Sequence, residues 1–156
     1  MKLTTFTDYS LRVMIYLAAQ PGQRATIAQI AQAFDVSANH LVKVAHFLGR
    51  QGWLATVRGK GGGLELGLPP EQIVVGTVVR ATEGEAAVAE CFEDADRCSL
   101  TPACRLRGVL REAVEAFYAV LDGYTLADLV RNRHQLSRIL FIDTPAGGTG
   151  RRSLHA

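Results

Sequence analysis

A glycine-rich segment at residues 58–63 places the tightest limit on how this chain can fold. Four of its six residues are glycines, and stretches of β-forming residues, 53–57 and 64–68, flank it. Glycine adopts the positive φ angles that tight hairpin turns require. The sequence therefore predicts a β-hairpin with two cations, Arg58 and Lys60, at its tip. A phosphate-binding loop for a nucleotide is the weaker interpretation, because no Gly-Lys-Ser/Thr is present and no helix follows the glycines.

Three stretches before the hairpin carry apolar residues at helical spacing, at 8–19, 26–34 and 37–51. Thr26 and Ser37 are suitable N-cap residues for the second and third helices. The short break between these two helices is typical of a helix-turn-helix. A hairpin directly after such a motif is a wing, which can enter a minor groove or contact phosphates.

The third helix would then be the reading helix, with its early outward side chains facing DNA. Asn39 and His40 are expected to reach base edges, and Lys43, Arg58 and Lys60 to contact phosphates or a groove. The alternative is an ordinary three-helix core with a solvated face. The full set of candidate DNA contacts is Ser37, Asn39, His40, Lys43, Arg58, Lys60, Gly61 and Gly62.

Charge is unevenly distributed although the net charge is only +2. Residues 1–65 carry seven basic and three acidic side chains, whereas residues 83–96 carry six acidic and none basic. No apolar run approaches the roughly 18 residues of a membrane span, and the first residues lack the pattern of a signal peptide. We therefore expect a cytoplasmic protein that does not bind a membrane.

The C-terminal half is predicted to be helical. A short buried helix at 73–81 and an acidic loop at 83–96 are expected before a long helix that Thr101 and Pro102 open and Gly123 closes. The long helix carries a coiled-coil-like seam, which indicates dimerisation, or packing on the N-terminal part as the alternative. A short helix capped by Thr125 follows. The seam residues are Leu106, Leu110, Ala113, Phe117 and Val120, spaced by four, three, four and three.

The predicted fold is mainly α with a small β-hairpin wing. Its parts are a winged helix-turn-helix DNA-binding domain at 1–70, a connecting helix and cysteine loop at 71–100, a dimerisation helix and C-terminal helix at 101–142, and a disordered tail at 143–156.

All three cysteines, Cys91, Cys98 and Cys104, lie within 14 positions. Their gaps are too long for a zinc knuckle, whereas thiolates on a loose loop suit an iron-sulfur cluster. Cys104 is expected in the first turn of the long helix, where free backbone N–H groups stabilise a thiolate. A fourth ligand is missing; Asp94 and Asp96 lie in the loop, and Asp8 lies in the first helix. The alternative is three thiols without a special role.

Five segments make the chain similar to the Rrf2 family of winged-helix regulators, and within it to the nitric-oxide-sensitive repressors. They are residues 3–12, 36–43, 57–63, 100–106 and 124–130. The resemblance implies a homodimer that binds a partly palindromic double-stranded operator DNA and represses nitrosative-stress genes. It implies one iron-sulfur cluster per subunit, 2Fe-2S or 4Fe-4S, whose nitrosylation by nitric oxide releases the DNA. Arg107 departs from the histidine of the family's iron-sulfur biogenesis regulators.

The resemblance also places the cluster loop near the first helix of the partner subunit, so that Asp8 would supply the fourth ligand across the dimer. Two other functions stay open. One is a repressor that senses redox state through thiols or zinc, and the other is an iron-sulfur carrier or assembly protein. An enzyme is not expected, because no Ser/His/Asp set or pair of catalytic carboxylates stands out.

Overall fold

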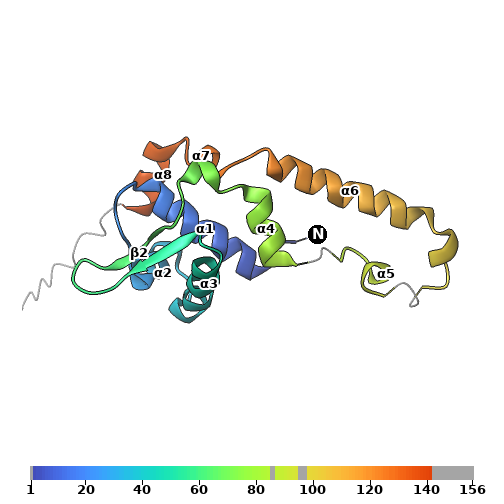
Figure 1. Cartoon of the computed structure of the whole chain (residues 1–156), viewed down its shortest axis with the longest axis horizontal. Coiled ribbons are helices and arrows are strands. Elements are labelled where there is room, and N and C mark those ends of the chain that lie inside the picture. Colours follow the sequence, from blue (N-terminus) through green and yellow to red (C-terminus); the bar gives the residue numbers. More distant parts are fainter. Residues whose placement is uncertain (1, 85–86, 95–97, 142–156) are drawn as a thin grey trace, which may run out of the picture.

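The computed structural model describes residues 2–84, 87–94 and 98–141, and it has an elongated shape in which one long helix extends from a compact part (Figure 1). In chain order the described elements are α1 (Thr5–Ala19), α2 (Ile27–Phe34), α3 (Ala38–Arg50), β1 (Leu54–Val57), β2 (Gly63–Leu66), the 3₁₀ turn η1 (Pro70–Gln72), α4 (Val75–Glu83), α5 (Glu90–Glu93), the 3₁₀ turn η3 (Thr101–Ala103), α6 (Arg105–Asp122), α7 (Leu126–Leu129) and α8 (Arg133–Leu140).

Helix α1 is the central element of the compact part. It packs against α3, α4, α7, α8 and β2. Val13 and Met14 are fully buried, because apolar residues occupy more than one face of the helix. The helix begins at Thr5 rather than Asp8, since the Thr4 hydroxyl accepts a hydrogen bond from the Thr7 backbone N–H (3.3 Å).

The predicted helix-turn-helix is confirmed in α2 and α3. Thr26 forms a capping box with Gln29 at the start of α2, and Asp35 ends that helix in the left-handed conformation at φ 51°. Ser37 occupies the N-cap of α3, but the prediction that it caps through its hydroxyl is wrong, because this exposed side chain accepts no hydrogen bond from the first turn.

The predicted hairpin is also confirmed. Strands β1 and β2 are antiparallel, with Leu54 opposite Leu66. The turn between them contains Gly59 at φ 89° and Gly61 at φ 75°, the conformations for which glycine was expected. Trp53 and Leu64 turn inward and join the core beneath α1 and α3.

The chain between α4 and α6 differs from its prediction. Helix α4 begins two residues later than expected, and α5 forms one helical turn where a loop was predicted. Helix α6 begins at Arg105 rather than Thr101, because Cys104 has an extended backbone (φ −77°, ψ 108°) that separates it from η3. Cys104 is therefore the N-cap residue of α6 and not part of its first turn.

The C-terminal elements pack on the central helix. Thr125 caps α7 as predicted, through a capping box with Asp128. Helix α8 was missed by the sequence analysis, which expected a single short helix after the long one. The predicted disordered tail, residues 143–156, lies outside the described residues.

Helix α6 is fixed to the compact part at its C-terminal end. Arg80 of α4 donates two hydrogen bonds to the Asp122 carboxylate, at 2.6 and 2.7 Å, and its guanidinium lies 4.5 Å from the centre of the Tyr118 ring. Val75 and Val79 of α4 pack with Tyr118 in a second apolar cluster. The N-terminal half of α6 extends beyond these contacts (Figure 1).

Two carboxylates, Asp122 of α6 and Asp128 of α7, make the stability of the fold depend on pH. The hydrogen bond from Arg80 lowers the pKa of Asp122, and the backbone N–H of Thr125 lowers the pKa of Asp128. A carboxyl group with a lowered folded-state pKa stabilises the fold above its unfolded pKa, and the contribution is lost as pH falls through the folded value. We expect the free energy of unfolding, measured by urea denaturation, to fall as pH drops below about 5. Asp122→Asn should flatten this dependence and Glu71→Gln should not; equal slopes in both variants would contradict it.

Candidate nucleic-acid interface and cysteine loop

The outer face of α3 carries the predicted reading residues. Asn39, His40 and Lys43 are exposed, as the sequence analysis expected. Val42 belongs to the same face and is 54% exposed. Sequence reasoning missed it, since a valine at helical spacing ordinarily indicates the core. An apolar side chain among polar ones gives this face a group that can contact a thymine methyl.

Aromatic contacts join α3 to α1. The His40 ring lies against Tyr9, with ring centroids 6.3 Å apart, and Phe6 meets Phe47 edge to face at 5.3 Å. Both pairs link the first half of α1 with α3. A displacement of α1 therefore moves the reading face with it.

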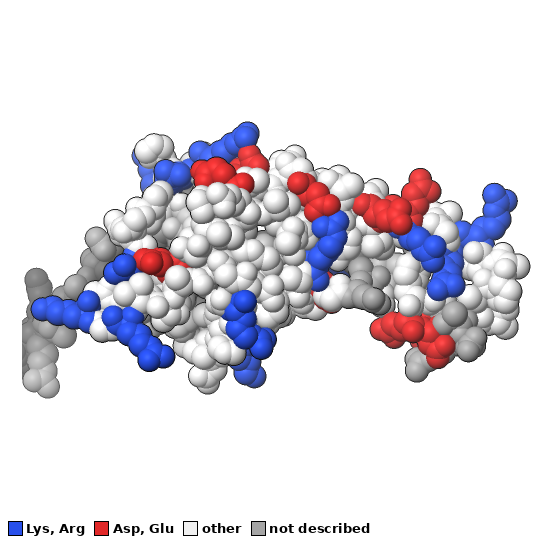
Figure 2. Space-filling model, in the orientation of Figure 1, with Lys and Arg blue, Asp and Glu red and all other residues white. Residues whose placement is uncertain are grey.

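The hairpin tip presents its two cations to solvent. Arg58 and Lys60 are exposed, and the Gly62 backbone N–H donates to the Gly59 carbonyl oxygen (3.0 Å). A Cβ atom at Gly62 would overlap the Val57 carbonyl oxygen and lie 2.8 Å from that of Gly59, so the turn requires glycine there. Figure 2 shows Lys and Arg side chains gathered along the lower edge of the molecule, where Figure 1 places the hairpin and α3.

The three cysteines are free, and each is half-buried. Cys91 lies in α5, Cys98 lies before η3, and Cys104 is the N-cap of α6. Within residues 2–84, 87–94 and 98–141, no three His, Cys, Asp or Glu side chains lie close enough together to hold a metal ion. The single chain does not gather the predicted ligands, and Asp96 lies outside the described residues.

Two buried polar atoms within three residues of Cys104 in the sequence have no hydrogen-bond partner among the described residues, Thr101 Oγ1 and Arg107 Nε. Buried donors of this kind are normally satisfied, and an anionic group in the loop would satisfy both. Three thiols also form the donor set that iron-sulfur clusters use. The residues therefore fit such a group in their chemistry, although they are not assembled around one.

Asp8 lies on α1 and pairs with Arg12 one turn later. Arg12 Nε donates to Asp8 Oδ1 at 3.1 Å, and its Nη2 lies 2.9 Å from Oδ2. Both side chains are about half exposed, so the pair contributes little to stability. A carboxylate held in this way is accessible to a partner chain once Arg12 releases one oxygen.

A hydroxyl and carboxylate network connects the start of α1 with the end of α4. Glu83 accepts hydrogen bonds from the Thr4 backbone N–H (2.7 Å) and hydroxyl (3.0 Å), and the fully buried Thr7 hydroxyl donates to Thr82 (2.8 Å). Burial opposes ionisation of Glu83, but the neighbouring Thr7 hydroxyl and the hydrogen bonds from Thr4 outweigh it and lower its pKa. Gly84 at φ 71° follows at once and begins the cysteine loop.

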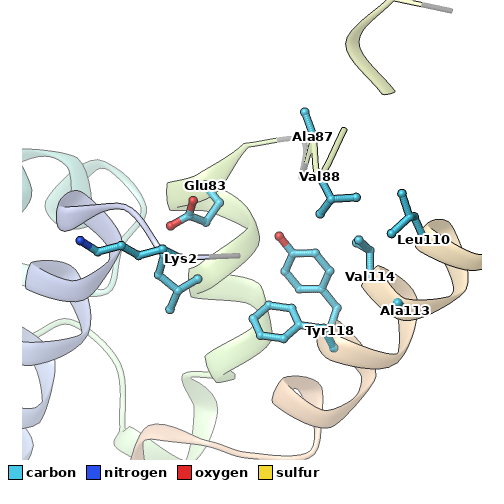
Figure 3. A pocket seen from close by; sticks show the side chains of 10 residues that line it. Lys2, Glu83, Ala87, Val88, Leu110, Ala113, Val114 and Tyr118 are labelled. Carbon is cyan, nitrogen blue, oxygen red and sulfur yellow. The ribbon is translucent and has the colours of Figure 1, made fainter. Parts of the chain in front are cut away.

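An apolar groove lies between this network and α6. It has a volume of about 670 Å³, and Figure 3 shows Leu110, Val114 and Tyr118 on α6 across from Glu83. The outward face of α6 continues it, with Leu106, Val109 and Val120 exposed to 61%, 60% and 62%. Exposed apolar surface of this extent marks an interaction surface.

A helix-turn-helix followed by a glycine-tipped wing, with a long helix beyond it, defines the winged helix-turn-helix class of proteins. The chain belongs to the Rrf2 family, described as iron-dependent transcriptional regulators, whose pattern matches residues 3–132.

Named relatives agree with this assignment. The chain is 50% identical to the HTH-type transcriptional regulator NsrR of Bacillus subtilis over 142 residues, which is 90% of this chain and 97% of the relative. Its fold is similar to that of CymR (YrzC), the global cysteine regulator of B. subtilis, at 32% identity and a TM-score of 0.66, with 85% and 98% of the two chains covered. It is similar to T. potens IscR at 26% identity and a TM-score of 0.69, with 87% and 90% covered. NsrR and CymR are named as regulators, which are not enzymes. No described helix of the chain is long and apolar enough to cross a membrane.

Proposed function

We propose that the chain is a transcriptional repressor that binds operator DNA in the cytoplasm. The observation that carries the proposal is the exposed reading face of α3 beside a cationic, glycine-tipped hairpin. Asn39 and His40 meet base edges, and Lys43, Arg58 and Lys60 contact phosphates. Ser37, Gly61 and Gly62 let the backbone approach the DNA closely, since their side chains are short or absent.

The repressor acts as a homodimer. The exposed face of α6 and the adjoining groove are apolar, and a second copy of the chain would bury them with its own matching apolar face. Two reading helices held about 34 Å apart meet successive major grooves on one side of the DNA. A partly palindromic operator follows from this symmetry.

The cysteine loop holds an iron-sulfur cluster, 2Fe-2S or 4Fe-4S, through Cys91, Cys98 and Cys104, with Asp8 of the partner subunit as the fourth ligand. A cluster bound there supplies iron that reacts with nitric oxide. The free and half-buried thiols and the unpartnered Arg107 Nε and Thr101 Oγ1 support this proposal.

The chain itself connects the loop to the reading face. Glu83, at the entrance of the loop, is bonded to Thr4 at the start of α1, and α1 packs on α3 through Tyr9 and Phe6. A change in the loop therefore displaces α3. A coupling of only about 1–3 kcal/mol would change DNA affinity about 5- to 150-fold.

The test is an anaerobic visible spectrum of the purified protein, followed by titration with nitric oxide and measurement of DNA binding at each step. We expect absorption near 400 nm, characteristic of thiolate bound to iron, that bleaches while DNA affinity falls. If the protein stays colourless after anaerobic reconstitution but binds DNA, the cluster is excluded and the proposal of a DNA-binding repressor stands. A coloured protein that binds no DNA would instead indicate an iron-sulfur carrier.

A second candidate is a repressor that senses through its thiols. The separated, free cysteines favour it, as does the likeness to CymR, whose S. aureus form is also known in an oxidised state. This candidate predicts DNA binding by iron-free protein that responds to oxidant and recovers with reductant.

Replacing Asp8 with alanine tests the proposed fourth ligand. We expect Asp8→Ala to change the cluster spectrum and weaken iron retention by about tenfold or more, because a ligand is lost. Arg12→Ala is the matched control, since it breaks the same ion pair but keeps the carboxylate. If both variants retain iron and bind DNA as the wild type does, Asp8 is not a ligand.

Replacing Lys60 with alanine tests the wing. We expect lower DNA affinity and a salt dependence (log K against log salt) shallower by about 0.9, since one phosphate contact is removed. Arg138→Ala, which removes a charge from α8, should change neither quantity. A Lys60→Ala protein with the affinity and salt dependence of the wild type would contradict the assignment of the wing.

A further inference from the structure

Arg24, in the loop between α1 and α2, reaches across to the hairpin. Its Nε donates to Glu65 Oε2 of β2 at 2.7 Å, and its Nη1 donates to the carbonyl oxygen of Gly61 at 3.4 Å. Arg24 was not among the candidate DNA contacts. The partners are 41 and 37 residues away in the chain, so no local pattern could indicate them.

The end of strand β2 next to the tip is already held without Arg24. Ala25 and Leu64 exchange both backbone hydrogen bonds, at 3.1 and 2.8 Å. Gly63, at φ 148°, approaches so closely that a Cβ atom would lie 2.9 Å from the Ala25 carbonyl oxygen. These contacts end at residue 63, whereas the cations Arg58 and Lys60 lie beyond it.

Among the described residues, the hydrogen bond from Arg24 to Gly61 reaches the tip, residues 58–62, from outside the hairpin. Glu65 orients the Arg24 guanidinium, and both side chains are about 40% exposed. Glu65 would otherwise be an unfavourable residue on a wing that approaches phosphates, because its charge repels DNA. Its place beside Arg24 gives it a role that offsets this repulsion.

We propose that Arg24 is a positioning residue of the wing: through Glu65 and Gly61 it holds the hairpin tip in the orientation that brings Arg58 and Lys60 to the DNA. This rests on the proposed DNA-binding function. Arg24 acts through the tip and does not contact DNA itself. The alternative, a direct contact from Arg24 to a phosphate, is a distinct outcome of the test.

The test compares Arg24→Gln and Glu65→Gln with the control Arg138→Gln, which removes the same charge from α8. The probe is a DNA duplex selected from a random library by the wild-type protein, titrated at several salt concentrations. For Arg24→Gln we expect about tenfold weaker binding and a salt dependence shallower by about 1.8, because the two phosphate contacts of Arg58 and Lys60, about 0.9 each, are lost. A direct phosphate contact predicts a change of about 0.9.

Glu65→Gln tests the proposal through the direction of the change in DNA affinity. Removing a negative charge next to DNA should strengthen binding if only charge matters. The positioning role predicts weaker binding, about two- to fivefold, because Arg24 loses its orienting partner. Stronger binding by Glu65→Gln, or a change of about 0.9 in the salt dependence of Arg24→Gln, would overturn the proposal.

A measurement without DNA tests the positioning role of Arg24 separately from the proposed DNA-binding function. In Arg24→Gln, amide hydrogen exchange of residues 54–66 should accelerate while α1 and α3 keep their protection. Unchanged exchange in the hairpin would refute the positioning role even if DNA binding fell. If the wild type selects no duplex, the proposed function fails, while the exchange result still decides whether Arg24 holds the tip.

Discussion

Cys104→Ala is expected to yield a protein that retains no iron after anaerobic reconstitution and whose DNA binding no longer responds to nitric oxide. Cys104 is the N-cap residue of α6, so a cluster bound to its thiol would be joined directly to the long helix. Its loss leaves two thiolates, Cys91 and Cys98, in the chain. Iron content per subunit and the visible spectrum near 400 nm measure the result.

Ser99→Ala is the matched control for this substitution, because Ser99 is an exposed neighbour in the same loop. The control should retain iron as the wild type does. Circular dichroism of both variants checks that the helices remain, since half-buried Cys104 contributes little to the core. A Cys104→Ala protein with full iron content would show that the thiol is not a ligand.

Gly76→Ala is expected to destabilise the fold by about 1–3 kcal/mol, a loss of roughly 2–4 °C in Tm for each kcal/mol. Gly76 lies within α4, where helix propensity alone predicts that alanine stabilises. The added Cβ atom would overlap the Asp122 carboxylate and lie 3.0 Å from the Asp122 backbone nitrogen. The carboxylate can move only by giving up its two hydrogen bonds from Arg80. Thermal unfolding at fixed protein concentration measures the effect.

Gly108→Ala is expected to change the stability of the fold in the opposite direction. Gly108 lies within α6, and no described atom beyond its own stretch of helix lies within 4 Å of the position of a Cβ, so alanine there should raise Tm. In an Asp122→Ala background, Gly76→Ala should cost less than in the wild type, since the overlapping carboxylate is gone. A Gly76→Ala protein that is as stable as the wild type would mean that α4 and α6 are not packed as described.

The elements that the sequence predicted well are those determined by local chemistry. Thr26 and Thr125 cap their helices as expected, and the glycines at 59 and 61 take the positive φ angles of the turn. Such features depend on a residue and its neighbours within about four positions. The exposed face of α3, on which the proposed DNA contacts lie, could be predicted for the same reason, because helical periodicity separates the buried Leu41 and Val44 from Asn39 and Lys43.

The remaining features depend on residues far apart in the chain. Thr101 and Pro102 have the right chemistry to begin a helix, yet the extended backbone of Cys104 moves the start to Arg105. The ion pair of Asp8 with Arg12 competes with the ligand role predicted for Asp8. The contacts of Arg24 with the hairpin and of Glu83 with Thr4 span 41 and 79 residues, beyond the range of any periodic pattern.

If the exposed apolar face of α6 forms the proposed dimer, repression depends on the number of molecules in the cell. Where the subunits are mostly apart, the concentration of dimer rises with the square of the total concentration. A twofold fall in copy number then lowers the amount of operator-binding species about fourfold. The strength of association along α6 would therefore set a threshold of expression, below which target genes escape repression in the absence of any signal.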